Sequence, residues 1–229
     1  MERSKVLLID MYGVIIKESK GYFIPYTFQH FPETEYDRLT NAFKVERVFS
    51  KAQKGQMTNE EFLGYLGYAN PRETMEDYLK NYLTLDEQFH DFAERVSKDM
   101  DFCLLSNDVL EWSEFLTEYH GMNVYFKDKI VSGEVYLRKP DKAIFECALE
   151  RLQCGPEDCI FVDNSVKNLR VAEELGMTVI FFNRDCEEYE GNVVNDFLEL
   201  EAMLSKDKKL LYSDEEYKKV RGNDYSLYM

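Results

Sequence analysis

Short apolar runs that alternate with segments of helical spacing limit what this chain can fold into more than any other feature. The apolar runs are Val6–Ile9, Phe102–Leu105, Ile160–Val162 and Val179–Phe182. Runs this short, and apolar throughout, are typical of parallel strands that are covered on both faces. Between them, apolar residues recur at helical spacing, as from Phe89 to Met100 and from Val166 to Leu175. This alternation predicts an α/β fold built on a doubly wound parallel sheet.

One long stretch interrupts the alternation. About 70 residues between the first apolar run and the helix expected near residue 87 contain no further strand-like run. They hold helix-like pieces at 36–52, 59–67 and 72–83, separated by glycines and Pro71. The tetrad Thr58-Asn59-Glu60-Glu61 is typical of a helix start with acids in its first turn. The stretch predicts an all-helical insertion above the carboxyl edge of the sheet.

We therefore expect a Rossmann-like α/β core with an inserted α-helical cap domain. The core comprises residues 1–15 and 86–205, the cap residues 16–85, and a C-terminal tail residues 206–229. The tail is charged and rich in tyrosine, which predicts a terminal helix or a poorly ordered end. Residues 21–31 are unusually aromatic. They are typical of the interior of the cap, or of a wall around a small, partly apolar substrate.

The charge balance excludes several classes of partner. Lys and Arg number 28 and Asp and Glu number 44, so the formal net charge is −16, and we expect no binding to nucleic acid or anionic lipid. The apolar stretches are too short to cross a membrane, and no secretory signal pattern opens the chain, so we expect a cytoplasmic protein. The five cysteines form no C-x-x-C pair, which argues against a disulfide framework and a thiolate zinc site.

The residues that follow the predicted strands are the candidates for chemistry. Asp10 follows the first strand, residues 106–108 follow the second, and Asp163 and Asn164 follow the third, while Lys139 precedes a predicted helix. The carboxyl ends of parallel strands meet at one edge, where α/β sheets bind their ligands, so these side chains are expected to converge. Each residue alone is an ordinary helix cap, turn residue or solvated lysine. The ordered set favours a functional site.

The same positions carry a resemblance to a known family. The segments concerned are Leu8–Val14, Leu104–Asn107, Arg138–Pro140 and Phe161–Asn164. In this order they resemble the four motifs of the haloacid dehalogenase superfamily of hydrolases, in the branch with a helical cap after the first motif. The resemblance covers about residues 5–185. It implies an enzyme acting on a small-molecule substrate, and we expect a monomer or weak homodimer.

The resemblance implies a role for each matching residue in catalysis. Asp10 is expected to be the nucleophile and to form a covalent aspartyl intermediate that water hydrolyses. Ser106 and Asn107 are expected to bind oxygens of the transferred group. Lys139 is expected to hold Asp10 ionised and to bind the substrate by neutralising its charge. An arginine from the cap is expected to catch the substrate, and Arg47 is a candidate.

The resemblance also implies a magnesium ion. Asp10, the backbone carbonyl of Tyr12 and Asp163 are the expected ligands, with Asn164 as a neutral outer partner. Oxygen ligands together with retained waters suit Mg²⁺.

Tyr12 departs from the phosphatase pattern of this superfamily. Phosphatases carry a second Asp two residues after the nucleophile as general acid and base, and a tyrosine, with a pKa of about 10, cannot exchange that proton near neutral pH. A Tyr here is similar to the L-2-haloacid dehalogenase branch, whose halide leaves without a proton. That branch dispenses with metal and usually lacks the acid found here as Asp163. Dehalogenases of that branch also have a Tyr at the position of Phe145 in this chain. They bind the substrate with an arginine, for which Arg38 and Arg47 are the candidates here.

Three hypotheses remain open at this point. The first is a Mg²⁺-dependent hydrolase acting on a small phosphorylated metabolite, and it is favoured because Asp163, Lys139 and Ser106 are present. The second is a haloacid-dehalogenase-like enzyme that works without metal. The third is a catalytically weakened, ligand-binding member in which the ring of Tyr12 closes the pocket.

Overall fold

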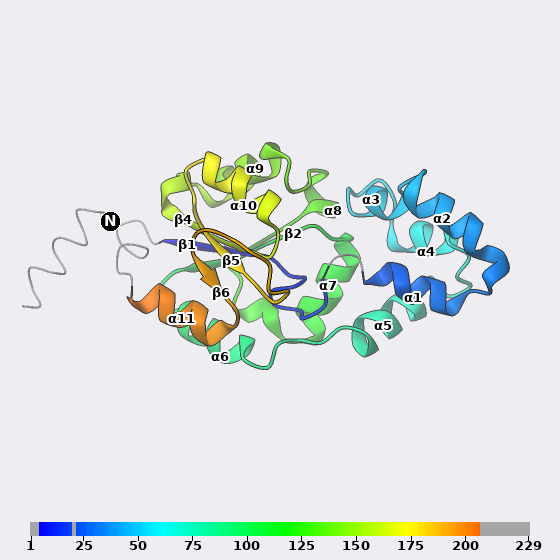
Figure 1. The fold of residues 1–229 in the computed structure, drawn as a ribbon, viewed down its shortest axis with the longest axis horizontal. Coiled ribbons are helices and arrows are strands. Elements are labelled where there is room, and N and C mark those ends of the chain that lie inside the picture. The colour runs from blue at the N-terminus through cyan, green and yellow to red at the C-terminus, as the bar shows by residue number, and fades with distance from the viewer. Residues whose placement is uncertain (1–4, 20–21, 207–229) are drawn as a thin grey trace, which may run out of the picture.

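The computed structural model describes residues 5–19 and 22–206. These residues contain a six-stranded parallel sheet in the order β3-β2-β1-β4-β5-β6, with helices on both faces (Figure 1). The strands are β1 (Val6–Ile9), β2 (Asp101–Ser106), β3 (Asp128–Val131), β4 (Cys159–Asp163), β5 (Thr178–Phe182) and β6 (Val193–Val194). The predicted doubly wound fold is confirmed. The four predicted strands are β1, β2, β4 and β5, which occupy the centre of the sheet.

The two strands that the sequence did not reveal lie at the edges of the sheet. β3 begins with Asp128 and Lys129, both half-buried, and β6 is only two residues long. An edge strand is paired and covered on fewer sides than a central one, so it does not need a continuous apolar run. The apolar-run criterion therefore finds only the central strands.

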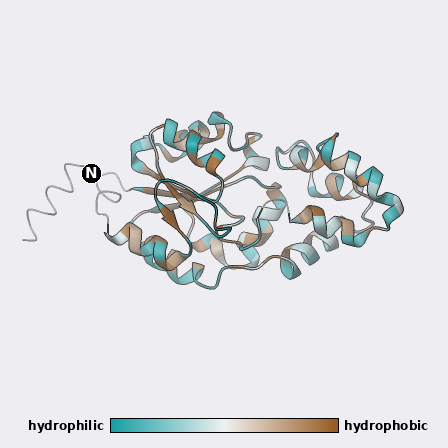
Figure 2. Ribbon diagram, in the orientation of Figure 1, coloured by the Kyte–Doolittle hydropathy of each residue, from teal (hydrophilic) through white to brown (hydrophobic). Residues whose placement is uncertain are grey.

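Each face of the sheet has its own hydrophobic core. Leu7 and Ile9 of β1 belong to one core, and Val6 and Leu8 belong to the other, as the alternation of side chains along a strand requires. The helices on the first face are α6 (Phe89–Val96), α7 (Leu110–Tyr119) and α11 (Phe197–Lys206), and those on the second are α9 (Lys142–Leu152) and α10 (Val166–Glu174) (Figure 1). Hydrophobic residues dominate the strands of the sheet (Figure 2).

A run of helices occupies the chain between β1 and α6. It comprises α1 (Phe23–His30), α2 (Tyr36–Lys44), α3 (Val48–Ala52), α4 (Asn59–Tyr65) and α5 (Pro71–Asn81), and we call residues 23–81 the helical segment. It confirms the predicted helical insertion, and α4 begins after Thr58, as predicted, where the structure shows a capping box. The single helix predicted over 36–52 is wrong. Arg47 has a left-handed φ of 55°, which separates α2 from α3.

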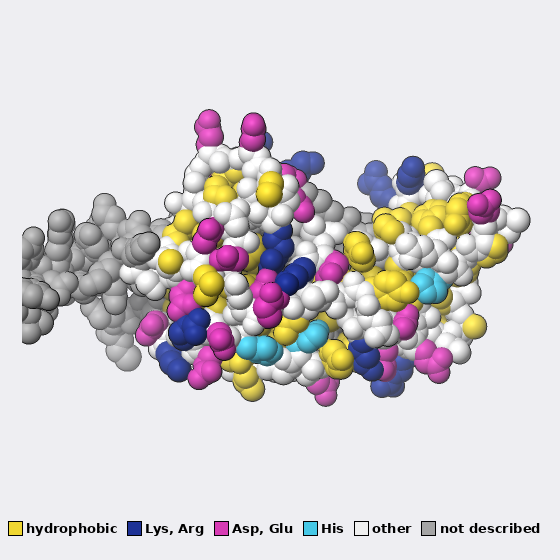
Figure 3. All heavy atoms as spheres, turned by 60° about the horizontal axis from the view of Figure 1, so that its bottom comes forward, with side chains coloured by type: hydrophobic (Ala, Val, Ile, Leu, Met, Phe, Trp, Pro, Cys, Tyr) yellow, Lys and Arg dark blue, Asp and Glu magenta, His cyan; other side chains and the backbone are white. Residues whose placement is uncertain are grey.

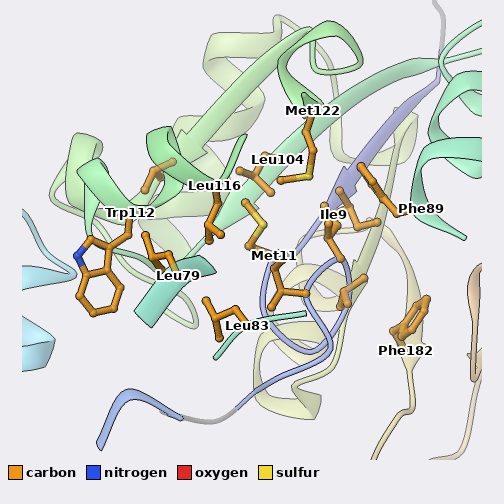
Figure 4. Packing of buried hydrophobic residues seen from close by; sticks show 14 of the residues in the cluster. Ile9, Met11, Leu79, Leu83, Phe89, Leu104, Trp112, Leu116, Met122 and Phe182 are labelled. Atoms are coloured by element: carbon orange, nitrogen blue, oxygen red, sulfur yellow. The ribbon is translucent and has the colours of Figure 1, made fainter. Parts of the chain in front are cut away.

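Aromatic side chains join the helical segment to α7. The ring centroids of Phe23 and Tyr78 lie 5.0 and 5.5 Å from that of Trp112 on α7. The Trp112 indole also donates a hydrogen bond of 2.8 Å to Asn59. Figure 4 shows Trp112 near Leu79 of α5 at one side of the buried cluster. Because α7 follows β2, these contacts hold the helical segment at the carboxyl edge of the sheet, where Figure 1 shows it.

The structure also bears on the expected surface. No helix among the described residues has the length and apolar character needed to cross a membrane. On the face shown in Figure 3, basic side chains of the described residues lie among acidic ones and form no continuous basic surface. The division into core, cap and tail stays a prediction, and all of the tail except Lys206 lies outside the described residues.

Candidate active site

The ends of β1, β2 and β4 and the helical segment enclose a cavity of about 590 Å³. The predicted site residues that line it are Asp10, Tyr12, Asn107, Lys139 and Asn164. Ser106 and Asp163 directly precede two of these residues in the sequence, but both are fully buried and do not line the cavity. The helical segment contributes aromatic side chains to the wall, among them Phe49 and Tyr78. Most of the predicted residues therefore converge at one edge of the sheet.

Lys139 links the ends of the two central strands. Its buried Nζ lies 2.9 Å from Asp10 Oδ1 and 2.7 Å from Asp163 Oδ2, and it donates a hydrogen bond of 2.7 Å to the Leu105 carbonyl. These three contacts use all three ammonium protons. Burial lowers the pKa of Lys139, but the charges of Asp10 and Asp163 outweigh burial and hold that pKa above its usual value. Lys139 is therefore a fixed cation between two carboxylates.

Asp10 presents one free carboxylate oxygen to the cavity. Oδ1 accepts a hydrogen bond of 2.8 Å from the Met11 amide and contacts Lys139, whereas no described residue donates to Oδ2. Burial and the nearby charge of Asp163 raise the pKa of Asp10 to about 7, although Lys139 opposes them. An ionised, positioned oxygen that is not hydrogen-bonded is what nucleophilic attack requires.

Asp163 is held by α10 and by Lys139. Its Oδ1 accepts a hydrogen bond of 2.7 Å from the Ser165 amide, and Asn168 Nδ2 lies 3.1 and 3.0 Å from its two oxygens. The adjacent Asn164 packs against the loop after β1. A Cβ on Gly13, where φ is 79°, would lie 1.9 Å from Asn164 Nδ2, so only glycine fits there.

The donor set at this edge fits a magnesium ion. The described residues contain no cluster of three or more His, Cys, Asp or Glu side chains placed to hold a metal. Mg²⁺ requires only one or two carboxylates and otherwise keeps its waters. Two buried carboxyl groups, Asp10 and Asp163, share the single cation Lys139, and burial disfavours the ionised form of Asp10. A cation bound beside Asp10 would favour that ionised form.

Tyr12 is hydrogen-bonded to the buried carboxylate of Asp108, for which the sequence indicated no role. Its hydroxyl donates a hydrogen bond of 3.0 Å to Asp108 Oδ2, which also accepts one of 2.7 Å from Ser113. The Val109 amide donates to Asp108 Oδ1 at 2.9 Å. The proton of Tyr12 is therefore directed at Asp108. The position of Asp108 directly after Ser106 and Asn107 was the only sequence signal for this contact.

The buried Asp108 predicts a fall in stability as the pH rises. Burial raises the pKa of Asp108 from 3.8 to about 7. Between these values the folded state binds more protons than the unfolded state, so the free energy of unfolding decreases from about pH 4 to about pH 7, by a few kcal/mol. We expect the free energy of unfolding to fall less for Asp108→Asn than for the wild type between about pH 5 and about pH 8. Urea titrations in the presence of a metal chelator measure this free energy. The exposed Asp37→Asn should keep the wild-type slope, and equal slopes for Asp108→Asn and the wild type would contradict the assignment.

The side chains of Asn107 and Ser106 differ in their hydrogen bonding. Asn107 exchanges two hydrogen bonds with the backbone of Lys139, of 2.9 and 2.8 Å, so it positions the lysine. Ser106 Oγ is buried and has no hydrogen-bond partner among the described residues. A buried hydroxyl without a partner is unfavourable, and an oxygen of a bound ligand would satisfy it.

The arginines expected to catch the substrate do not reach the cavity. Arg47 directly precedes α3 and is not among the described residues that line the cavity, and its predicted role stays untested. Arg38 is engaged within the helical segment by Glu35 and two backbone carbonyls. Gln53 lines the cavity instead and donates a hydrogen bond of 3.2 Å to the Asn107 carbonyl. Arg138 lines it too, and neither Gln53 nor Arg138 had been assigned a role from the sequence.

Lys139→Met is expected to destabilise the fold as well as the site. Removing the cation leaves Asp10 and Asp163 buried without a counter-charge, which costs about 3–5 kcal/mol in comparable pairs. Urea unfolding without added metal measures this loss. Lys142→Met removes an exposed lysine that pairs with Glu146 and should change stability little. Equal stability of the two variants would contradict a counter-ion role for Lys139.

Sequence comparisons relate the chain to known hydrolases. Residues 4–176 match the family model described as haloacid dehalogenase-like hydrolase. D-ribitol-5-phosphate phosphatase from Bacteroides thetaiotaomicron is 25% identical over 183 residues, covering 75% of this chain and 88% of that protein. A glyceraldehyde 3-phosphate phosphatase from Methanothermobacter thermautotrophicus is 31% identical over 101 residues, covering 43% of this chain and 44% of that protein.

Solved structures share the fold. A haloacid dehalogenase (HAD) family enzyme from Bacteroides thetaiotaomicron superposes with a TM-score of 0.70 at 20% identity, covering 82% of this chain and 97% of that one. A structure of the wild-type form of such an enzyme from the same organism, in complex with magnesium and inorganic phosphate, has a TM-score of 0.67 at 22% identity and covers 82% and 98% of the two chains. A dehalogenase structure has a TM-score of 0.64 at 16% identity, with coverage of 90% and 100%.

Proposed function

Because the chain belongs to the haloacid dehalogenase-like hydrolases, we propose that it is a Mg²⁺-dependent phosphatase of small phosphate esters with Asp10 as its nucleophile. The observation that carries the proposal is the free Oδ2 of Asp10, which faces the cavity while Lys139 and the Met11 amide hold the other oxygen. Ser106 ends β2, which pairs with β1, and its buried hydroxyl has no hydrogen-bond partner among the described residues, which supports an oxygen-rich ligand. The relatives named as phosphatases of sugar and polyol phosphates favour a small phosphorylated metabolite as the substrate.

The reaction proceeds in two displacements at phosphorus. Asp10 Oδ2 attacks the phosphorus atom, and the bond between phosphorus and the leaving oxygen breaks with its electron pair on that oxygen. Water then attacks the phosphorus of the aspartyl phosphate, releasing inorganic phosphate, which keeps the protons of the water, and restoring the Asp10 carboxylate. An alkoxide leaving group takes its proton from solvent, because no side chain at position 12 supplies one. Lys139 opposes the effect of burial on the pKa of Asp10 and so favours the ionised carboxylate before the attack. The buried Ser106 hydroxyl would donate to a phosphoryl oxygen that reaches the end of β2.

Three residues would hold the magnesium ion, namely Asp10, Tyr12 through its carbonyl, and Asp163. Asn164 would lie in the outer shell. When bound, Mg²⁺ neutralises negative charge on the phosphoryl oxygens.

We expect Mg²⁺ to bind the metal-free protein with measurable heat at millimolar concentration in a calorimetric titration. Asp163→Asn should abolish that heat, because it removes one of the two carboxylates at the site. Asp141→Asn, an exposed substitution at the start of α9, should leave the heat unchanged. A silent titration of the wild type, or equal heats for the two variants, would argue against the metal.

Tyr12 favours a second candidate, a dehalogenase-like hydrolysis of 2-haloacids. A halide leaves without a proton, so the absence of a carboxylic acid at position 12 would not impair that reaction. A screen of aryl phosphates, alkyl phosphates and 2-chloropropionate, with and without Mg²⁺, separates the candidates, with Asp10→Asn as the blank. Turnover of phosphate esters supports the proposal, and turnover of the haloacid alone supports the alternative. No turnover of any substrate supports the weakened, ligand-binding member.

A further inference from the structure

Arg138, the residue before Lys139, has an unsatisfied buried donor in the cavity wall. Its side chain lines the cavity, and its Nε is buried without a hydrogen-bond partner among the described residues. None of the described carboxylates lies within ion-pair distance of it, and the charge of Asp141 acts on it only from farther away. A guanidinium taken partly out of water without a counter-ion is unfavourable. The side chain therefore has unused capacity to bind an anion.

The other cations of the described cavity wall, and its carboxylate Glu18, are already engaged or are exposed to solvent. Lys139 has no free proton, because Asp10, Asp163 and the Leu105 carbonyl take all three. Glu18 accepts two hydrogen bonds from Thr84, of 2.7 and 2.9 Å. Lys167 also lines the cavity but is exposed. Arg138 is thus the half-buried cation of the described cavity wall that has donors to spare.

We propose that Arg138 forms a second anion subsite, which binds a carboxylate or a second phosphoryl group carried by the substrate. The inference rests on the proposed function, since the first subsite is the phosphate site at Asp10. A guanidinium binds either kind of oxyanion through two parallel hydrogen bonds. A cavity of about 590 Å³ is of the size that encloses small ligands, with room for two anionic groups. The substrate class is therefore a small phosphate ester with a second negative group.

Binding of non-hydrolysable probes tests this subsite without turnover. Calorimetry with Mg²⁺ present compares inorganic phosphate, methylphosphonate, phosphonoacetate and methylenediphosphonate on the wild type, Arg138→Met, Arg138→Lys and Arg170→Met. Arg170 is exposed on α10, does not line the cavity, and controls for the lost charge. We expect Arg138→Met to weaken the preferred two-anion probe by roughly 10–100-fold and to leave methylphosphonate and inorganic phosphate nearly unchanged. Arg138→Lys should recover part of the loss, and Arg170→Met should match the wild type.

Each outcome of this comparison decides the inference. If the protein binds phosphonoacetate more tightly than methylphosphonate, and this difference depends on Arg138, the subsite binds a carboxylate. If only methylenediphosphonate shows such a difference in affinity, the subsite binds a phosphoryl group. Equal affinity of the wild type for one-anion and two-anion probes overturns the inference, and so does a preference for two-anion probes that Arg138→Met retains. So does a loss of inorganic phosphate binding in Arg138→Met, which would place Arg138 in the phosphate site itself. If the wild type binds no phosphate or phosphonate at all, the proposed function fails and the inference fails with it.

Discussion

Asp10→Asn is expected to lower the hydrolysis of phosphate esters by roughly 10⁴-fold or more, because it removes the attacking oxygen. The amide oxygen of Asn can still accept from Lys139 and from the Met11 amide, which hold Asp10 Oδ1 in the wild type. The fold should therefore survive. Initial rates with an aryl phosphate and saturating Mg²⁺ measure the effect, and thermal unfolding shows that the variant is folded.

Asp141→Asn is the matched control for this substitution. It makes the same chemical change at an exposed carboxylate at the start of α9 and should keep the wild-type rate. A folded Asp10→Asn variant that retains more than a few per cent of the wild-type rate would remove Asp10 from the nucleophile role.

Tyr12→Asp is expected to raise alkyl phosphate hydrolysis by roughly 10²–10⁴-fold, which is what a general acid contributes. In the wild type the Tyr12 proton is committed to Asp108 at 3.0 Å, so no acid serves the leaving group at this position. An alkoxide needs a proton to leave, whereas an aryl oxide does not. Aryl phosphate hydrolysis should therefore change little. Steady-state rates on one aryl and one alkyl phosphate measure both effects.

Tyr12→Asn separates the acid from the change in size. It opens the same space as Tyr12→Asp but supplies no exchangeable carboxyl proton, so its alkyl phosphate rate should stay at the wild-type level. Equal gains for the two variants would show that space and not acid catalysis is responsible. The dehalogenase-like alternative gives a different result, in which Tyr12→Asp gains nothing on phosphates and loses haloacid turnover.

The central strands and the residues at their ends could be predicted because burial on both faces demands apolar runs. Asp10 and Asp163 interrupt or end such runs, so a carboxylate there stands out in the sequence. The edge strands β3 and β6 could not be found in this way, since half-exposed edges tolerate residues such as Asp128 and Lys129. The break between α2 and α3 at Arg47 could not be predicted either, because no residue pattern signals a left-handed φ at an arginine.

The contacts between side chains that are far apart along the chain could not be predicted from the sequence. Tyr12 and Asp108 are 96 residues apart, and only the parallel pairing of β1 with β2 brings the residues after them together. The same holds for Asn107, expected to bind substrate but found holding the backbone of Lys139, 32 residues away. Spacing identified which residues gather at the carboxyl edge. It did not reveal which of them contact each other and which remain free for a ligand.

The most direct test of the central claim is detection of a phosphorylated Asp10 during turnover. The protein is mixed with an aryl phosphate and Mg²⁺, quenched with acid before one turnover is complete, digested and examined by mass spectrometry. We expect the peptide that contains Asp10 to gain the mass of one phosphoryl group at that residue, and the Asp10→Asn variant to gain none. Release of phosphate by the wild type without any phosphorylated Asp10 peptide at any quench time would contradict the assignment of Asp10 as the nucleophile.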